Sequence, residues 1–130
     1  MKTVMAFGTF DILHPGHINF LKQAKKYGSL IVIIARDKTV REVKGKTPKY
    51  SEKERLKALK SLNLADKAIF GSLNDKYAAI KKYKPKLITL GYDQTYFTDR
   101  LKDELKRLKL KTKVIRLKPH KPEIYKSSKL

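Results

Sequence analysis

The stretch that decides the fold reads FGTFDILHPGH, residues 7–17. The apolar run 3–7 is typical of a short strand, and apolar residues then recur at helical spacing over 16–27 until Gly28 ends the pattern. A helix that begins here presents unpaired backbone N–H groups and the positive end of its dipole, which both favour a bound anion. Two imidazoles three residues apart, His14 and His17, add hydrogen-bond donors at that helix end. The stretch therefore predicts a site for a phosphate-rich ligand.

Strands and helices alternate along the rest of the chain. The continuous apolar run 30–35 is typical of a central strand covered on both faces. Further strands are expected at 67–70, 87–90 and 113–117, helices at 51–62 (with Ser51 as N-cap), 75–83 and from Thr98 or Asp99 to 108, and a polar loop at 41–50. This alternation implies right-handed βαβ units. We expect an α/β fold: a Rossmann-like, doubly wound, parallel five-stranded sheet with helices on both faces, in a single domain over residues 1–130.

The composition limits where the protein works and what it binds. The net charge is +20, and hydrophobic residues make up 41% of the 130 residues, enough for a packed core. There is no cysteine, which excludes disulfides, and no apolar run approaches the ~18 residues of a membrane helix. We expect a soluble cytoplasmic protein with no membrane partner. Because the excess charge is mostly lysine spread along the chain, it favours a solvated surface, or steering of a small anion, over nucleic-acid binding.

Clusters of polar residues follow the predicted strands. Residues 8–11 and the two histidines follow the first strand, and Arg36-Asp37 with the lysine-bearing loop follows the second. Gly91-Tyr92-Asp93-Gln94 follows the fourth strand, and Ser127-Ser128 lies beyond the fifth. In open α/β sheets ligands bind at the carboxyl ends of strands, near the topological switch point. We therefore expect these clusters around one crevice.

Other phosphate- and metal-binding signatures fit less well. Gly45-Lys46-Thr47 looks like the end of a P-loop, but Val40 occupies the place of its first glycine, and no G-x-G-x-x-G fingerprint is present. A zinc site from His14, His17 and the distant His120 is compatible with the spacing but has no obvious carboxylate partner in the sequence. A purely structural role for the two early histidines is the remaining alternative.

Gly8-Thr9-Phe10-Asp11 followed by His14-Pro15-Gly16-His17 resembles the signature of the HxGH nucleotidylyltransferase superfamily, in its cytidylyltransferase-like branch. The similarity covers nearly the whole chain. Glycerol-3-phosphate cytidylyltransferases share this layout. The chain resembles the archaeal FAD synthases more closely, through Ala35-Arg36-Asp37, Lys44-Gly45-Lys46, Leu90-Gly91-Tyr92-Asp93-Gln94 and Ser127-Ser128-Lys129. Cytidylyltransferases of this layout carry Arg-Thr-Glu-Gly-Ile-Ser-Thr-Thr near the C-terminus, where this chain has residues 123–128 with no arginine.

The resemblance implies transfer of a nucleotidyl group, in which an acceptor phosphate attacks the α-phosphorus of a nucleoside triphosphate and pyrophosphate leaves. It implies ATP rather than CTP as the donor and FMN as the acceptor, with CTP and glycerol 3-phosphate as the alternative pair. A divalent metal, magnesium or else cobalt or manganese, would be bound mainly through the triphosphate, with no metal site of the protein's own. A homodimer is expected by analogy with relatives.

The same resemblance assigns roles to individual residues. The catalytic set, which stabilises charge on the phosphates, is His14, His17, Lys44 and Lys46. The nucleotide-binding set is Gly8, Thr9, Phe10, Gly16, Arg55, Gly91, Asp93, Gln94, Ser127 and Ser128. The acceptor-binding set is Asp11, Arg36 and Asp37.

Overall fold

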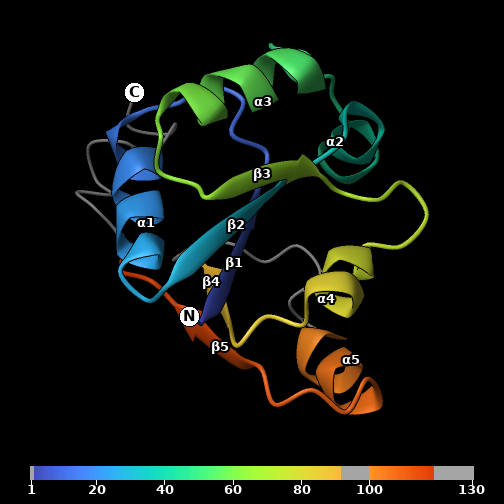
Figure 1. The fold of residues 1–130 in the computed structure, drawn as a ribbon. Coiled ribbons are helices and arrows are strands. Elements are labelled where there is room, and N and C mark those ends of the chain that lie inside the picture. The colour runs from blue at the N-terminus through green and yellow to red at the C-terminus, as the bar shows by residue number, and fades with distance from the viewer. Residues whose placement is uncertain (1, 92–99, 119–130) are drawn as a thin grey trace.

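The computed structural model describes residues 2–91 and 100–118 of the chain. Strands and helices alternate along these ranges (Figure 1). Their bounds are β1 (Thr3–Gly8), α1 (Pro15–Lys25), β2 (Ser29–Ile34), α2 (Asp37–Lys44), α3 (Glu52–Ser61), β3 (Lys67–Phe70), α4 (Ala78–Tyr83), β4 (Leu87–Leu90), α5 (Leu101–Arg107) and β5 (Lys113–Arg116).

The strands form one parallel sheet in the order β3-β2-β1-β4-β5. The central strand β1 pairs with β2 on one side, where Gly8 lies opposite Ile34, and with β4 on the other, where Ala6 lies opposite Thr89. The chain leaves β1 toward β2 and β3 and then crosses over to β4 and β5. The topological switch point therefore lies between β1 and β4, and the residues after Gly8 begin where ligands bind in open α/β sheets.

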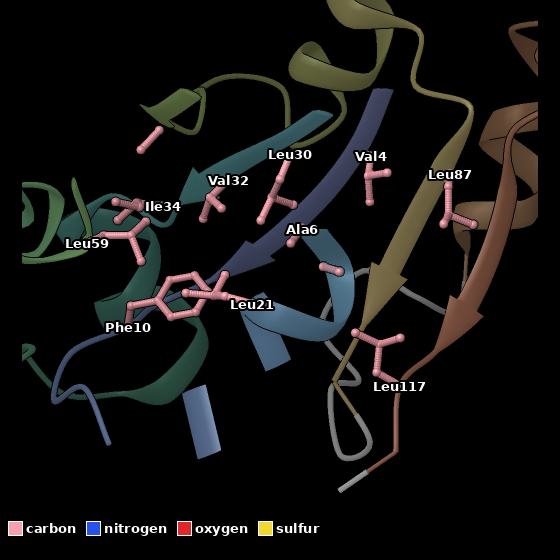
Figure 2. Close-up of a cluster of buried hydrophobic side chains, with 12 residues drawn as sticks. Val4, Ala6, Phe10, Leu21, Leu30, Val32, Ile34, Leu59, Leu87 and Leu117 are labelled. Atoms are coloured by element: carbon pink, nitrogen blue, oxygen red, sulfur yellow. The ribbon is translucent and has the colours of Figure 1, made fainter. Parts of the chain in front are cut away.

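Helices cover both faces of the sheet, as predicted (Figure 1). Val4 of β1 lies in a buried cluster with Leu21 of α1 and Leu59 of α3 (Figure 2). Its neighbour Met5 points to the opposite face, where a second cluster contains Ile80 of α4 and the buried leucines of α5. The sheet is thus buried between α1 and α3 on one face and α4 and α5 on the other, which confirms the predicted Rossmann-like fold class.

The region after β2 differs from the expected polar loop over 41–50. Residues Asp37–Lys44 form the helix α2, so the expectation was wrong for residues 41–44. Asp37 places a carboxylate in the first turn of this helix, and Gly45 ends it with a φ of +74°, in the left-handed region that favours glycine. Within its 8 residues only Val40 is buried, and most of the others are charged, so the segment was expected to be a polar loop although Val40 and Val43 recur at helical spacing.

The starts of α3 and α4 follow from local hydrogen bonds. Ser51 caps α3 as predicted: its Oγ accepts from the Glu54 N–H at 3.2 Å, while the Glu54 carboxylate accepts from the Ser51 N–H. The predicted helix from residue 75 begins at Ala78 instead. The Asp75 carboxylate accepts from the Tyr77 N–H at 2.9 Å, which holds residues 75–77 in a turn ahead of the helix.

Two further predictions concerned the end of α1, at Gly28, and the start of α5, at Thr98 or Asp99. α1 ends at Lys25, and Gly28 lies in the turn that follows, where a Cβ would come within 2.3 Å of the Lys2 carbonyl oxygen. The predicted N-cap of α5, Thr98 or Asp99, lies outside the described residues.

Across residues 2–91 and 100–118, none of the helices has the length and apolar character needed to span a membrane.

Candidate active site

His14 and His17 lie side by side at the start of α1, after the turn that follows β1. His14 is the N-cap of the helix, and its Nδ1 accepts a hydrogen bond from the Gly16 N–H at 3.0 Å. The two imidazole rings stack, with centroids 3.9 Å apart and planes at 26° to each other. Because Nδ1 of His14 accepts, the proton of the neutral ring is assigned to Nε2, which makes Nε2 the donor. The structure therefore brings together the two histidines that the sequence predicted as a pair.

Gly16 has no room for a side chain because the His14 ring lies against it. A Cβ at this position would lie 2.7 Å from Cε1 and 3.0 Å from Nδ1 of His14. Any larger residue must displace the imidazole. The predicted contact between the Gly16 N–H and the nucleotide stays a prediction, and in this structure that N–H donates to His14.

The turn between β1 and α1 is strained and tightly packed. Phe10 has a φ of +52°, in the left-handed region that non-glycine residues rarely adopt. Its ring is buried, folds back over Gly8, where a Cβ would lie 2.6 Å from it, and meets the His17 ring edge-on with centroids 5.5 Å apart. Gly8 and Phe10 thus shape the support for His17, while their predicted nucleotide contacts stay predictions.

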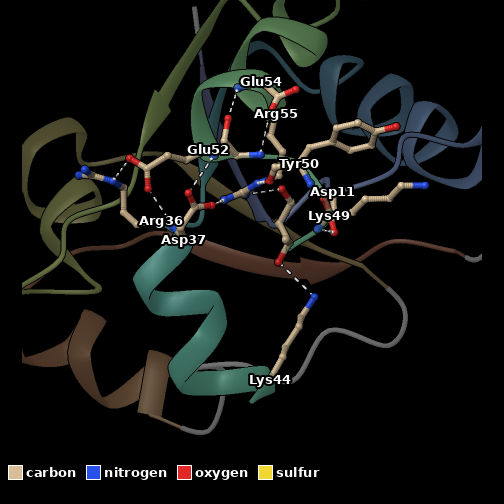
Figure 3. A network of polar contacts seen from close by, with 11 residues as sticks. Asp11, Arg36, Asp37, Lys44, Lys49, Tyr50, Glu52, Glu54 and Arg55 are labelled. Carbon is tan, nitrogen blue, oxygen red and sulfur yellow. Dashed lines mark hydrogen bonds and ion pairs between the residues drawn. The ribbon is translucent and has the colours of Figure 1, made fainter. Parts of the chain in front are cut away.

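Lys44 and Lys46 lie on either side of Gly45, which ends α2. Lys44 is the last residue of the helix, and its Nζ donates to Oγ1 of Thr9 at 3.2 Å (Figure 3). Lys46 is exposed in the segment 45–51 that leads to α3. Lys44 therefore reaches the turn after β1 from the end of a helix, and not from the loop that the sequence suggested.

Arg55 of α3 is the charged side chain most deeply buried in the described part of the chain, with 1% of its surface exposed. Its Nε donates to the Tyr50 carbonyl at 3.2 Å, its Nη1 to the Thr9 carbonyl at 2.8 Å and its Nη2 to the Asp37 carboxylate at 2.7 Å (Figure 3). The guanidinium thus joins the turn after β1, the start of α2 and the segment before α3. The predicted direct contact of Arg55 with the nucleotide stays a prediction beside these three bonds.

The starts of α2 and α3 are tied together by a reciprocal contact. The Asp37 N–H donates to Glu52 Oε1 at 2.9 Å, and the Glu52 N–H donates to Asp37 Oδ2 at 3.2 Å, so each carboxylate caps the other residue's helix. Arg36 Nε donates to Glu52 Oε2 at 2.9 Å. Partial burial raises the pKa of the Asp37 carboxyl, but hydrogen bonds from Arg55 and the Glu52 amide outweigh it and hold this pKa below its ordinary value. Arg36 and Asp37, the predicted acceptor ligands, are engaged in this contact.

Asp11 holds the segment before α3 against the turn after β1. Its Oδ2 accepts from the Lys49 N–H at 2.7 Å and its Oδ1 from the Tyr50 N–H at 2.8 Å (Figure 3). Both oxygens of this predicted acceptor ligand are therefore bonded to backbone amides. The bonds close the segment 45–51 over the turn that begins the site.

Gly91 lies at the end of β4, on the other side of the switch point. Its carbonyl accepts from Arg116 Nη1 at 2.7 Å, which ties the ends of β4 and β5 together. Several predicted residues lie outside the described residues: Asp93, Gln94, Ser127 and Ser128 of the nucleotide-binding set and His120 of the zinc alternative.

A family model described as cytidylyltransferase-like matches residues 5–130. The chain belongs to the cytidylyltransferase-like family. This match confirms the resemblance that Gly8-Thr9-Phe10-Asp11 and His14-Pro15-Gly16-His17 indicated, and it supports nucleotidyl transfer as the class of reaction.

Relatives of this cytidylyltransferase-like chain are named FAD synthase. The FAD synthase of Methanohalophilus mahii is 44% identical over 132 residues, which cover 100% of this chain and 92% of the relative. That of Archaeoglobus profundus is 48% identical over 119 residues, which cover 91% of this chain and 76% of the relative. The family and these relatives together identify the chain as a nucleotidyltransferase and confirm the predicted resemblance to the FAD synthases.

Solved structures of related proteins share the fold. The lipopolysaccharide core biosynthesis protein from Thermoplasma volcanium superposes with a TM-score of 0.86 at 41% identity, covering 92% of this chain and 98% of the other. The pantoate-beta-alanine ligase of Francisella tularensis superposes with a TM-score of 0.64 at 18% identity, covering 89% of this chain and 58% of the other. The second likeness bears on the fold alone, and both agree with the cytidylyltransferase-like architecture.

The parts played by Glu52, Tyr50 and Arg116 were not predicted from the sequence. Acidic residues in the first turns of two successive helices, Asp37 and Glu52, are a signal for capping, but they do not reveal that the two helices begin side by side. The backbone of Tyr50 carries no sequence signal at all, since any residue supplies the same N–H and carbonyl. Arg116 ends the last strand, and a cation there is compatible with many partners.

Proposed function

We propose that this chain is an FAD synthase that transfers the adenylyl group of ATP to the phosphate of FMN. The observation that carries the proposal is the stacked pair His14 and His17, with Lys44 nearby at Thr9, beyond the central strand of a cytidylyltransferase-like fold. Relatives named FAD synthase, at 44% to 48% identity, favour ATP and FMN over CTP and glycerol 3-phosphate. The absence of the cytidylyltransferase arginine from residues 123–128 points the same way.

In the proposed reaction a phosphate oxygen of FMN attacks the α-phosphorus of ATP. The new P–O bond forms as the bond from the α-phosphorus to the bridging oxygen breaks, and pyrophosphate leaves with the electron pair. The attacking group is already an anion, so the protein needs no nucleophile and acts by aligning the reactants and stabilising charge. His14, through Nε2, and His17 donate to the α- and β-phosphates. Lys44 and Lys46 approach the phosphates from α2 and from the segment after it.

A divalent metal fits this site as an ion held by the triphosphate. The Asp11 carboxylate is bonded to two backbone amides, and the Asp37 carboxylate to Arg55 and the Glu52 amide. In the part of the chain that the structure describes, no three His, Asp or Glu side chains are grouped to hold a metal ion. Mg²⁺ keeps several waters and takes few protein carboxylates. Magnesium, or cobalt or manganese in its place, would neutralise phosphate charge while the chain's own residues hold the nucleotide.

The remaining predicted residues complete the proposal. Asp93 and Gln94 recognise the base, and Ser127 and Ser128 bind phosphate. Asp11, Arg36 and Asp37, the predicted acceptor ligands, hold segments of the chain together through intramolecular hydrogen bonds. These bonds favour a role in shaping the acceptor side of the site over direct contact with the acceptor. The enzyme acts as a cytoplasmic homodimer.

Pyrophosphate release in the presence of ATP and FMN tests the proposal. We expect turnover with magnesium or cobalt, and FAD as the second product, identified by chromatography and its absorbance. The same assay with CTP and glycerol 3-phosphate separates the cytidylyltransferase alternative. No pyrophosphate from ATP and FMN with either metal would refute the proposed function.

The net charge of +20 motivates one alternative of another class, a basic nucleic-acid-binding module. Such a module would bind RNA or DNA tightly, with a steep salt dependence, and His14→Ala would leave that binding intact. Loss of triphosphate binding in His14→Ala, together with weak nucleic-acid binding by both proteins, would exclude the module.

A further inference from the structure

We propose that Arg55 is a positioning residue: it fixes the helix that carries Lys44 relative to the turn that carries Thr9, and thereby sets where the Lys44 ammonium meets the triphosphate. The inference rests on the proposed function, because it concerns how the same site is assembled. It gives Arg55 a part that differs from the direct nucleotide contact expected from the resemblance.

The Arg55 guanidinium is fully engaged by its surroundings. The Arg55 side chain has no exposed surface, and each of its three nitrogens donates to a different segment: the Tyr50 carbonyl, the Thr9 carbonyl and the Asp37 carboxylate. A direct bond to a phosphate would require the side chain to leave these acceptors. The ion pair with Asp37 and the hydrogen bonds to the two carbonyls would then be lost, and breaking a partly buried charged pair is costly.

The contacts of Arg55, Asp37, Lys44 and Thr9 form a closed circuit. Arg55 binds Asp37 in the first turn of α2, and Lys44 at the last position of the same helix donates to the Thr9 hydroxyl at 3.2 Å. The Thr9 carbonyl accepts from Arg55, which closes the ring through a single residue of the turn. An eight-residue α-helix is about 12 Å long and rigid along its axis. Fixing its first turn therefore also fixes where its last residue lies.

The geometry of this circuit requires an arginine at position 55. A lysine at position 55 keeps the positive charge beside Asp37 but carries all its donors on one nitrogen, whereas arginine presents donors on three nitrogens in a rigid fork. Three acceptors on three segments, approached by Nε, Nη1 and Nη2, require such a fork. Arg55→Lys therefore retains the charge and loses the geometry.

A double-mutant cycle with Lys44→Ala tests the proposal through pyrophosphate release from ATP and FMN. If Arg55 acts through Lys44, Arg55→Lys lowers kcat/KM by up to about 100-fold in the wild-type background. In the Lys44→Ala background the same change then lowers kcat/KM by no more than about twofold. Losses that multiply in the double variant would indicate that Arg55 contacts the nucleotide itself, and would overturn the proposal. Arg107→Lys, on an exposed pair with Glu104, is the matched control and is expected to have wild-type kinetics.

Asp37→Asn provides a second route through the same circuit should Arg55→Lys fail to fold. It removes the anion that Nη2 binds, and it is expected to show the same loss of effect when Lys44 is alanine. Multiplying losses in this cycle too would overturn the proposal.

Amide hydrogen exchange gives a readout that does not need turnover. Arg55→Lys removes the donor to the Asp37 carboxylate, so exchange at the Asp37 and Glu52 amides, which join the first turn of α2 to α3, is expected to accelerate at least severalfold, while Arg107→Lys leaves it unchanged. Unchanged exchange would overturn the proposal. A wild-type protein that fails to make FAD would refute the proposed function alone, since this measurement would still report on the circuit.

Discussion

The Gly16 N–H donates to Nδ1 of His14 at 3.0 Å, so one imidazole caps α1 and has its donor proton on the other nitrogen. The cap contributes to the stability of the helix, and the Nε2–H serves the proposed transfer reaction. These two contributions come from different atoms of the same ring. Substitutions that keep one atom and remove the other therefore separate them.

His14→Asn keeps an acceptor near the position of Nδ1 and removes Nε2. We expect about a 100- to 1000-fold fall in kcat, the loss typical of one donor to transition-state charge, with a free energy of unfolding close to that of wild type. His14→Ala loses the cap as well, at a cost of about 1 kcal/mol. Pyrophosphate release and urea unfolding measure the two effects. A fully active His14→Asn protein, or equal stability losses in both variants, would contradict this assignment.

Gly16→Ala is expected to disable the site by displacing His14, because its Cβ would lie 2.7 Å from Cε1 of the ring. A shift of about 1 Å in a catalytic group costs up to about 100-fold in rate. Gly71→Ala, after β3, is the matched control: its Cβ would meet Ile33 at 3.5 Å, an ordinary contact. Steady-state kinetics of the two variants should differ by that factor, and equal activities would show that the ring has room to move.

The alternation of elements was predictable because each long element carries its own signal. The run 30–35 is apolar throughout, and Ser51 is the N-cap that the sequence predicts for the helix now seen as α3. The pair His14 and His17 was predictable for the same reason, since both lie at one helix end within three residues of each other. Local signals of this kind do not depend on the rest of the chain.

The network around Arg55 was not predictable, because its partners come from segments far apart in the sequence. The sequence led us to expect Arg55 at the nucleotide, and only the fold shows that Thr9 and Asp37 lie beside it. Likewise α2 buries only Val40, and Asp37 and Glu52 tie its first turn to α3, so this mostly charged segment was expected to be a loop. Polar tertiary contacts of this kind leave no periodic pattern.

Asp37 should make the stability of the protein depend on pH. The hydrogen bonds from Arg55 and the Glu52 amide hold the folded pKa below the ordinary value of 3.8, against the opposing effect of partial burial. A carboxyl with a depressed folded pKa contributes stability that is present above the unfolded pKa and is lost as pH falls through the folded pKa. Below about pH 5, the free energy of unfolding should fall more steeply for wild type than for Asp37→Asn. Urea unfolding over this range measures both slopes, and a constant difference between the two proteins would contradict the expectation.

Lys44 and Lys46 should differ in how salt affects their contributions. Lys44→Met keeps the aliphatic stem but removes the ammonium beside Thr9, and we expect about a 100-fold loss of kcat/KM at every ionic strength tested. Both lysines are exposed, but the Lys44 ammonium is held at Thr9 by a hydrogen bond, whereas Lys46 lies beyond the end of α2. The loss caused by Lys46→Met should therefore reflect attraction over a longer distance, and it should shrink as salt rises and screens the charge. Lys57→Met, on the exposed side of α3, removes the same charge away from the site and should leave the kinetics unchanged. If Lys57→Met lost as much activity as Lys44→Met, general attraction of the triphosphate to a basic surface, rather than the place of Lys44 beside Thr9, would explain the effect.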